Sequence, residues 1–422
     1  MAHKWPYFPI EDVSEKVAMG PFGSSIKVST FVPNGIPVIS GQHLHGLKVA
    51  DTEFNFITEK HAERLKNANV MRGDVIFTHA GNIGQVAYVP DTSRYERYVI
   101  SQRQFYMRCN TTKILPEFIT YFFKTREGQH KLLANTSSTG VPSIARPVTY
   151  LRSIEVPVPP LATQRRIAHI LGALDDKIEL NQRMNRTLEQ MAAAIFKSWF
   201  IDFDPVLAKA EGRDPKLPPE ITDLFPDAFE ESEVGLIPMG WEVSRFGDLL
   251  ELAYGKSLKA QDRRPGLVAV YGSNGQVGWH DSALASGPGV IVGRKGNPGI
   301  VTWAASDFFP IDTTFYVVAT GQVRSLYFLY YVLRNHDLAS LGADSAVPGL
   351  NRNMAYMSKQ IVPPSCLVMN FDAFVRPIFD RIHACEQQNL CLAYMRDALL
   401  PKLLTGENQL YEAATVAKEV GS

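Results

Sequence analysis

The sequence predicts a protein in which a compact domain followed by a long helix occurs twice. Three observations lead to this prediction. The chain of 422 residues is longer than one ordinary domain, a set of motifs recurs in the same order about 210 residues later, and each copy precedes an extended heptad pattern. With 45% hydrophobic and 20% charged residues, the composition is that of a globular protein and excludes wholesale disorder.

Three motifs carry the repeat. Gly81-Asn82-Ile83-Gly84 recurs as Gly296-Asn297-Pro298-Gly299, and Phe105-Tyr106 recurs as Phe315-Tyr316. Each aromatic pair precedes an aromatic segment with a helical pattern. The third motif consists of Val141-Pro142, Arg146, Tyr150 and Val156-Pro157 in the first copy and of Val347-Pro348, Arg352, Tyr356 and Val362-Pro363 in the second. Because the three motifs keep one order, we infer an internal duplication.

Heptad patterns predict long helices at residues 161–200 and 366–406. Pro377 is expected in the first turn of the second helix. The predicted seam residues are Ile167, Leu171, Leu174, Ile178, Asn181, Asn185, Leu188, Ala192, Ile195 and Trp199 in the first helix and Phe371, Val375, Ile378, Ile382, Cys385, Asn389, Leu392, Arg396, Leu399 and Leu403 in the second. Polar residues at four of these positions are typical of helices that pair in a fixed register. The simplest arrangement is an antiparallel coiled coil with the two domains at opposite ends; the alternative is that each helix packs on its own domain.

Composition sets the remaining boundaries. Residues 201–240 contain 3 basic and 10 acidic residues and are rich in proline, which is typical of an extended linker without a core of its own. The predicted parts are a first domain at 1–160, a first helix at 161–200, a linker at 201–240, a second domain at 241–365, a second helix at 366–406 and a tail at 407–422.

The signatures of common enzymes are incomplete. Tyr254-Gly255-Lys256-Ser257 resembles the end of a phosphate-binding loop, but Leu250 stands where the loop requires glycine. Asp175-Asp176-Lys177 contains part of a nuclease motif, yet its position in a heptad helix predicts a solvated face. His43-Leu44-His45 lacks the further ligands of a metal site. The sequence therefore predicts a non-catalytic chain without a metal or cofactor.

The cellular setting follows from what the sequence lacks. The four cysteines form no Cys-x-x-Cys pair, which argues against a zinc knuckle or a disulfide framework. No apolar run approaches the 18 or so residues of a membrane span, and the first residues do not resemble a secretory signal. We expect a cytoplasmic protein with no membrane partner.

Two similar, mildly basic domains on a rigid pair of helices suit a target with two parts at a fixed separation, and double-stranded DNA is the natural candidate. Lys and Arg would contact phosphates, and Arg, Lys, Asn, Gln or His would read base edges. The candidate residues in the first domain are Lys27, Gln42, His43, His45, His79, Asn82, Gln102 and Arg103. Those in the second are Lys256, Lys259, Tyr271, Ser273, Asn274, Gln276, His280, Arg294, Lys295, Asn297, Asn351 and Arg352. For each, an ordinary solvated turn is the alternative, and the repeated Arg146 and Arg352 equally suit a structural role at the Val-Pro turn.

Several segments together resemble the specificity (S) subunit of type I restriction-modification systems, over nearly the whole chain. These are Val156 to Leu161 leading into Gln164-Arg165-Arg166-Ile167-Ala168, Ile178-Glu179-Leu180-Asn181, Lys197 to Pro205, Ile237 to Trp241, Tyr271 to Gly275, Gly293 to Gly296, and Leu399 to Gly406. The second helix departs from the pattern because it lacks the Gln-Arg-Arg-Ile start of the first.

The resemblance implies an α+β protein: two target recognition domains of mixed α/β type, related by a pseudo-twofold repeat and separated by two long helices in an antiparallel coiled coil. Each domain would read one half of a bipartite DNA sequence, and the helices would set the gap. Such a subunit has no activity of its own. It binds two adenine-methylating M subunits, to which two R subunits can be added, so S-adenosylmethionine and ATP with magnesium are expected only on partners. Two alternatives stay open: an interaction scaffold that does not bind DNA sequence-specifically, and a cryptic nuclease using Asp175 or Asp227.

Overall fold

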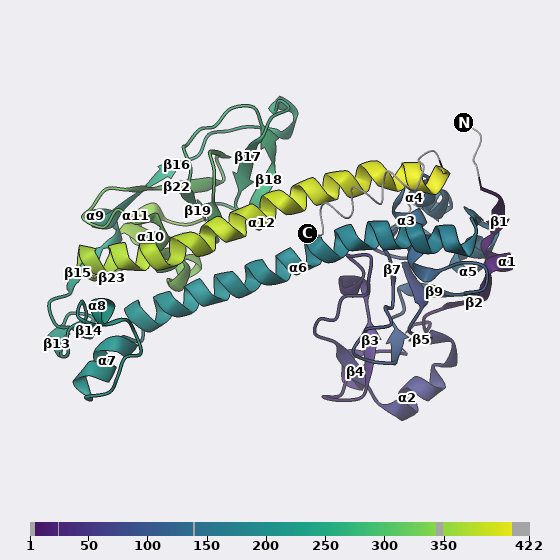
Figure 1. The fold of residues 1–422 in the computed structure, drawn as a ribbon, viewed down its shortest axis with the longest axis horizontal. Helices are drawn as coiled ribbons and strands as arrows, with labels where there is room; N and C mark the ends of the chain where they lie inside the picture. Colours follow the sequence, from purple (N-terminus) through teal and green to yellow (C-terminus); the bar gives the residue numbers. More distant parts are fainter. Residues whose placement is uncertain (1–4, 24, 138–139, 343–348, 407–422) are drawn as a thin grey trace. The chain divides into compact units, whose positions relative to one another are not determined.

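The computed structural model describes residues 5–23, 25–137, 140–342 and 349–406, which belong to two compact units (Figure 1). Unit 1 comprises Met1–Glu179 and Asn389–Ser422, and unit 2 comprises Leu180–Gln388. Two long helices, α6 (Leu161–Phe200) and α12 (Ser365–Thr405), each contribute one end to either unit. Within the described ranges, no helix is long and apolar enough to cross a membrane.

Unit 1 contains two four-stranded sheets. The first is antiparallel and has the order β2 (Ser14–Met19), β9 (Gln104–Cys109), β6 (Asp74–Thr78) and β7 (Val86–Tyr88). The second has the order β4 (Asn55–Ile57), β3 (Ile36–Ile39), β8 (Arg97–Ile100) and β5 (Asn69–Met71), with β3 and β8 parallel. Two small antiparallel pairs are β1 (Tyr7–Pro9) with β12 (Glu155–Pro157) and β10 (Thr136–Ser137) with β11 (Ser143–Ile144). The short helices are α1 (Ile10–Val13), α2 (Glu59–Arg64), α3 (Pro116–Lys124), α4 (Arg126–Leu133) and α5 (Pro147–Ser153).

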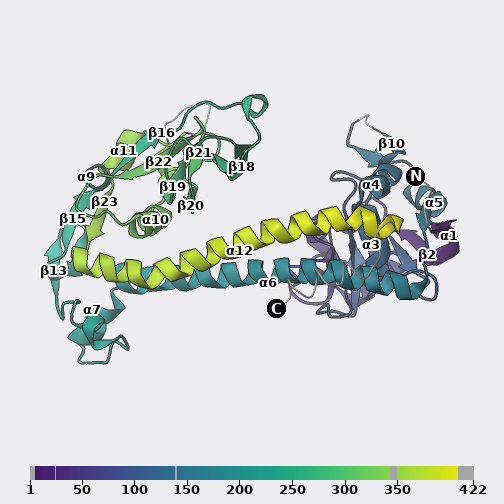
Figure 2. The same ribbon diagram turned by 45° about the horizontal axis from the view of Figure 1, so that its top comes forward.

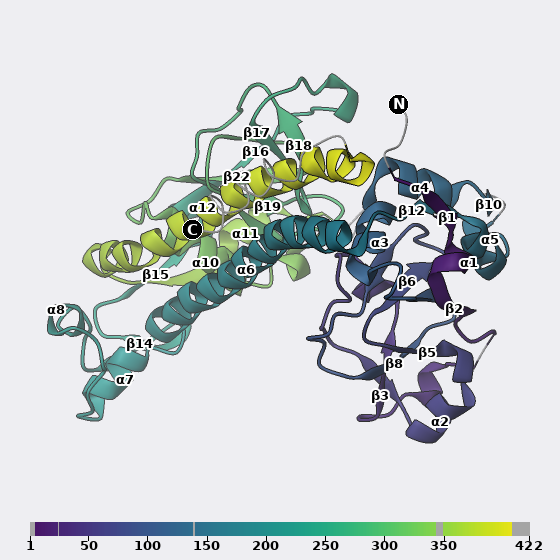
Figure 3. The same cartoon turned by 45° about the vertical axis from the view of Figure 1, so that its right-hand side comes forward.

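The first sheet of unit 1 lies between a helical layer and the second sheet (Figure 3). Alternate residues of each strand point to opposite faces of the sheet, and each face packs into a separate hydrophobic core. Phe77 and Phe105 pack with the residues of α3 and the long helices, whereas Ile76 and Tyr106 pack with Val38 and the rest of the second sheet. Both faces are therefore buried, which explains why the three central residues of β6, Val75 to Phe77, are all apolar.

Unit 2 repeats this arrangement. Its antiparallel sheet has the order β16 (Leu250–Tyr254), β22 (Thr314–Ala319), β19 (Gly289–Gly293) and β20 (Val301–Ala304). The second sheet is β18 (Gly275–His280), β17 (Val268–Gly272) and β21 (Phe308–Pro310), with β17 and β21 parallel. Two further antiparallel pairs are β15 (Glu242–Arg245) with β23 (Lys359–Val362) and β13 (Phe229–Ser232) with β14 (Gly235–Pro238). The helices are α7 (Asp204–Ala210), α8 (Pro219–Thr222), α9 (Phe246–Leu249), α10 (Leu326–Asn335) and α11 (Arg352–Met357). Helix α10 lies beside α12 (Figure 2), and Tyr327 of α10 packs edge-on against Phe379 of α12.

The strand register confirms the duplication. In β6 and β9, Phe77 pairs with Phe105 and Ile76 with Tyr106, and in β19 and β22 the pairs are Val292 with Phe315 and Ile291 with Tyr316. The two aromatic motifs thus occupy equivalent positions in the antiparallel sheets of the two units. The two Gly-Asn-x-Gly motifs form the β6–β7 and β19–β20 turns, with φ of 84° and 87° at the glycines of the first and 82° and 84° at those of the second. Val347-Pro348 of the third motif lies outside the described residues.

The long helices pair antiparallel within each unit. In unit 2, Asn181 Nδ2 donates to Gln388 Oε1 at 2.8 Å and Asn185 Nδ2 to the Ile382 carbonyl at 3.3 Å. In unit 1, Ile167 and Leu171 share a core with Leu400 and Leu403. The same core and its counterpart in unit 2 include residues of the sheets and of α3 or α10. The helix ends therefore pack on the domains as well as on each other, and both arrangements considered from the sequence are present.

Pro377 lies inside α12, not in its first turn as expected. The helix begins at Ser365 because Pro363 and Pro364 stop any earlier start. Val375 and Phe379 on either side of Pro377 are buried in the core of unit 2. The burial of these side chains stabilises the helix and compensates for the backbone hydrogen bond that Pro377 cannot donate.

Residues 201–240 are not an extended linker. They form α7, α8 and the β13–β14 hairpin. Val206, Ile221 and Phe225 are buried in the core of unit 2, where Phe225 packs edge-on against Trp199 with ring centroids 5.4 Å apart. The few apolar residues of this segment join an existing core, which its acidic, proline-rich composition concealed.

Candidate nucleic-acid interface

Loops at one end of both sheets of unit 1 converge around the Gly81–Gly84 turn. The backbone N–H of His79 donates to the Arg103 carbonyl at 2.9 Å, which joins the β6–β7 and β8–β9 loops. Gln85 connects this pair to the loop after β3, because its Nε2 donates to the Gly41 carbonyl at 3.0 Å. The sequence-predicted residues of three separate loops are thereby brought together.

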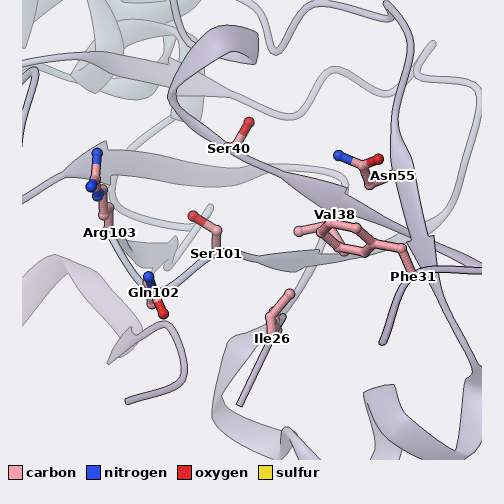
Figure 4. A pocket seen from close by; sticks show the side chains of 8 residues that line it. All are labelled: Ile26, Phe31, Val38, Ser40, Asn55, Ser101, Gln102 and Arg103. Atoms are coloured by element: carbon pink, nitrogen blue, oxygen red, sulfur yellow. The ribbon is translucent and has the colours of Figure 1, made fainter. Parts of the chain in front are cut away.

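A pocket of about 210 Å³ opens beside these loops (Figure 4). Its apolar lining comes from Ile26, Phe31 and Val38, and its polar lining from Ser40, Asn55, Ser101, Gln102 and Arg103. Gln102 and Arg103 extend from the β8–β9 loop at one side of the pocket (Figure 4). Six candidates of unit 1 are exposed: Lys27, Gln42, His45, Asn82, Gln102 and Arg103.

His43 is not available for DNA contact, contrary to the sequence prediction. Its side chain is 1% exposed and stacks on Phe54 with ring centroids 4.5 Å apart. Nδ1 accepts from the Ser40 backbone N–H at 2.9 Å, and Nε2 donates to the Glu53 carbonyl at 3.2 Å. Burial lowers the pKa of His43, which favours the neutral ring that this bonding requires. His43 therefore holds the loop that presents Gln42 and His45.

His79 is half-buried and also has a structural partner. Its Nε2 donates to the Gln102 carbonyl at 3.1 Å, and its ring lies edge-on to Phe105. Burial lowers the pKa of His79 as well. It supports the loop of Gln102 and Arg103 as a neutral donor.

The equivalent loops of unit 2 converge in the same way. The Arg294 and Lys295 backbone N–H groups both donate to the Thr313 carbonyl, at 2.8 and 3.1 Å. Ser273 Oγ lies 2.5 Å from the Lys295 carbonyl oxygen and 2.7 Å from that of Thr313, so its single proton is shared between the two acceptors. Asn297 Nδ2 donates to Asn274 Oδ1 at 2.5 Å. The turn that follows β17 is thus fastened to the Gly296–Gly299 turn.

Several candidates of unit 2 have structural roles instead of free surfaces. His280 is 5% exposed and accepts from the Arg264 backbone N–H at 3.0 Å. Asn351 caps α11 by accepting from the Asn353 and Met354 N–H groups, and Tyr271 packs edge-on against Phe308. The exposed candidates are Lys256, Lys259, Asn274, Gln276, Lys295 and Asn297, while Ser273, Arg294 and Arg352 are half-buried.

Two residues of these surfaces were missed by the sequence reasoning. Gln85 follows the first Gly-Asn-x-Gly motif directly, and its Oε1 accepts from Thr78 Oγ1 at 3.0 Å. Tyr254, 49% exposed, precedes Gly255-Lys256-Ser257, a segment tested only as a phosphate loop. Both residues lie next to a motif of the sequence, and this position could have identified them.

Asp175 does not lie on a solvated helix face, as the sequence suggested. It accepts from Tyr121 Oη and from Arg396 Nη1, both at 2.7 Å. The neighbouring Asp176 pairs with Lys48. The carboxylate is used in packing, which does not favour the nuclease alternative. No group of three or more His, Cys, Asp or Glu residues is placed to hold a metal ion in the described part of the chain.

Comparisons with known proteins agree with this geometry. Residues 3–190 match the family model described as "Type I restriction modification DNA specificity domain". The type I restriction enzyme HindI specificity subunit of Haemophilus influenzae is 27% identical over 409 residues, covering 80% of this chain and 87% of that protein. The type I restriction enzyme MjaIX specificity subunit of Methanocaldococcus jannaschii is 24% identical over 444 residues, covering 97% and 94%. The crystal structure of the type I restriction-modification S subunit from M. genitalium has the same fold, with a TM-score of 0.58 and 16% identity over 95% of this chain and 96% of that one.

Proposed function

We propose that the chain is a specificity subunit of a type I restriction-modification system and selects the DNA sequence on which such a complex acts. The match of residues 3–190 to the specificity-domain model and the similarity to two specificity subunits over most of the chain support this proposal. Each unit reads one half of a bipartite target through the loops around its Gly-Asn-x-Gly turn. The long helices set the gap between the halves and bind two M subunits. The chain itself catalyses no reaction.

One observation carries this proposal: equivalent positions of the two loop clusters share a framework and differ in chemistry. Gly81, Asn82 and Gly84 correspond to Gly296, Asn297 and Gly299, and the glycines of both turns have positive φ angles between 82° and 87°. Around that constant frame, His79 corresponds to Arg294 and Arg103 to Thr313, since the same backbone hydrogen bond joins each pair. Two copies of one scaffold with different donors and acceptors suit two different half-sites.

The partners and cofactors of the complex follow from the same proposal. Double-stranded DNA and two adenine-methylating subunits bind this chain, and two R subunits complete a restriction complex where they are present. S-adenosylmethionine and ATP with magnesium bind to those subunits. Such a complex acts on DNA in the cytoplasm.

Long-read methylation sequencing tests the proposal. A host expressing the chain with its cognate methyltransferase is compared with a host expressing the methyltransferase alone. A bipartite N6-methyladenine motif found only with the chain is the expected result. If a purified complex forms but produces no motif, the interaction scaffold becomes the better account.

The nuclease alternative makes a separate prediction. It requires that the purified chain alone cleaves DNA when a divalent metal is added. We expect no cleavage, because Asp175 is bonded to Tyr121 and Arg396.

A further inference from the structure

Two arginines of unit 2 lie against one tyrosine ring. The guanidinium carbon of Arg294 is 4.8 Å from the centroid of Tyr254, and that of Arg352 is 4.9 Å from it. The three residues come from separate elements: the last position of β16, the β19–β20 loop and the first turn of α11. With 49% of its surface exposed, Tyr254 carries both cations at the edge of the loop cluster.

The position of Arg294 is fixed by several contacts. Its Nη1 donates to the Asp312 carbonyl at 3.2 Å. It also lies 5.6 Å from the Phe315 ring, which packs edge-on against Tyr254 with centroids 5.0 Å apart. The Arg294 side chain is therefore already ordered before any ligand binds, so binding costs little of its conformational entropy.

Arg352 is fixed in a similar way. It lies 5.7 Å from the ring of Tyr356, whose hydroxyl accepts from the Leu252 backbone N–H at 2.8 Å. The Leu350 backbone N–H donates to the Arg294 carbonyl at 2.9 Å, so the two arginine segments are joined directly.

The two guanidiniums of this cluster have no carboxylate in direct contact among the residues that the structure describes. Both are within 5 Å of one centroid, so they are at most about 10 Å apart, which is about one Debye length at 0.1 M salt. The two positive charges therefore repel each other. A phosphate bound by both guanidiniums would reduce this repulsion, whereas a neutral base edge would not.

We propose that Arg294 and Arg352, held by Tyr254, bind one phosphate region of the DNA backbone and so position unit 2 on its half-site. This inference rests on the proposed function and adds a phosphate site to it. Arginine suits the role because its planar donors match phosphate oxygens. The site is particular to unit 2: Met19 stands at the position of Tyr254 and the half-buried His79 at that of Arg294.

The test measures how DNA binding depends on salt. The full chain is titrated with a short duplex of unrelated sequence, followed by fluorescence anisotropy, at several salt concentrations between about 50 and 200 mM. Each phosphate contact contributes about 0.9 to the slope of log K against log salt. Because the two arginines share one phosphate, we expect R294Q/R352Q to lower the slope by about 0.9 and each single variant to lower it by less.

Two control variants separate the site from general charge effects. Y254F keeps the ring and should keep the slope. R245Q removes an exposed positive charge of unit 2 outside the loop cluster and should leave the slope nearly unchanged. An equal loss of slope in R245Q and R294Q would overturn the proposal.

A second readout distinguishes phosphate from base contacts. Methylation sequencing of R294Q/R352Q with the methyltransferase should give the same motif at lower occupancy. A change of one recognised base would show that these arginines read bases, and the phosphate site would be rejected while the proposed function stands. If the original chain, with its methyltransferase, has neither DNA affinity nor a motif, the proposed function itself fails.

Discussion

Arg396 of α12 donates to the Asp175 carboxylate of α6 at 2.7 Å, and the side chains are only 30% and 19% exposed. Tyr121 of α3 donates to the second oxygen of the same carboxylate. The helices α3, α6 and α12 are therefore joined through the Asp175 carboxylate. The phenol does not ionise there, because burial and the Asp175 charge raise the pKa of Tyr121.

Replacing Arg396 by methionine should lower the free energy of unfolding by about 2 kcal/mol, since it leaves a partly buried carboxylate with one donor fewer. Urea denaturation followed by circular dichroism measures the change. Arg381→Met, at an exposed position of the same helix, is the control. Equal effects of the two substitutions would mean that the bond to Asp175 adds no stability.

The turn glycines should differ in their sensitivity to alanine. Gly296 and Gly299 both have φ above 80°, so alanine at either position costs about 1 kcal/mol of backbone strain. A Cβ at Gly296 meets nothing within 4 Å, whereas one at Gly299 lies 2.8 Å from the Ala339 backbone nitrogen. Gly299→Ala should therefore lower the melting temperature clearly more than Gly296→Ala. A melting temperature for Gly299→Ala equal to that of Gly296→Ala would contradict the clash.

Buried His43 should make stability depend on pH. Burial lowers its pKa in the folded chain below the usual value near 6.5. Its contribution is then complete above about pH 6.5 and is lost as the pH falls toward the folded pKa, because the unfolded chain takes up the proton first. The slope of unfolding free energy against pH between about 5 and 7 should be smaller in His43→Gln. His130→Gln, at an exposed position, is the control and should keep the original slope.

Lengthening both helices should change the gap in the recognised motif. Inserting one heptad into α6 after Arg183 and one into α12 after Glu386 keeps the seam in phase and adds about 10 Å of helix. The gap should then widen by about three base pairs, read by methylation sequencing. Inserting two residues into each helix is the control, because it turns the seam by about 200° and should abolish the motif. An active heptad variant with the original gap would refute the proposal that the length of the helices sets the gap.

The sequence by itself determined the repeat, the two long helices and the polar positions in their seams. These follow from local patterns: heptad spacing decides where a helix forms, and turn glycines occur where φ must be positive. Asn181 of the predicted seam bonds to Gln388, which precedes the predicted seam residue Asn389, so the structure was needed to identify this partner.

Only the tertiary structure decided which polar residues are free to bind. His43 and His45 are two positions apart, yet one is buried against Phe54 and the other is exposed. Tyr254 meets Arg294 and Arg352 only because β16 and β19 end where α11 begins. Contacts between residues far apart in the chain leave no local pattern, so composition assigned residues 201–240 to a linker although their apolar side chains complete a core.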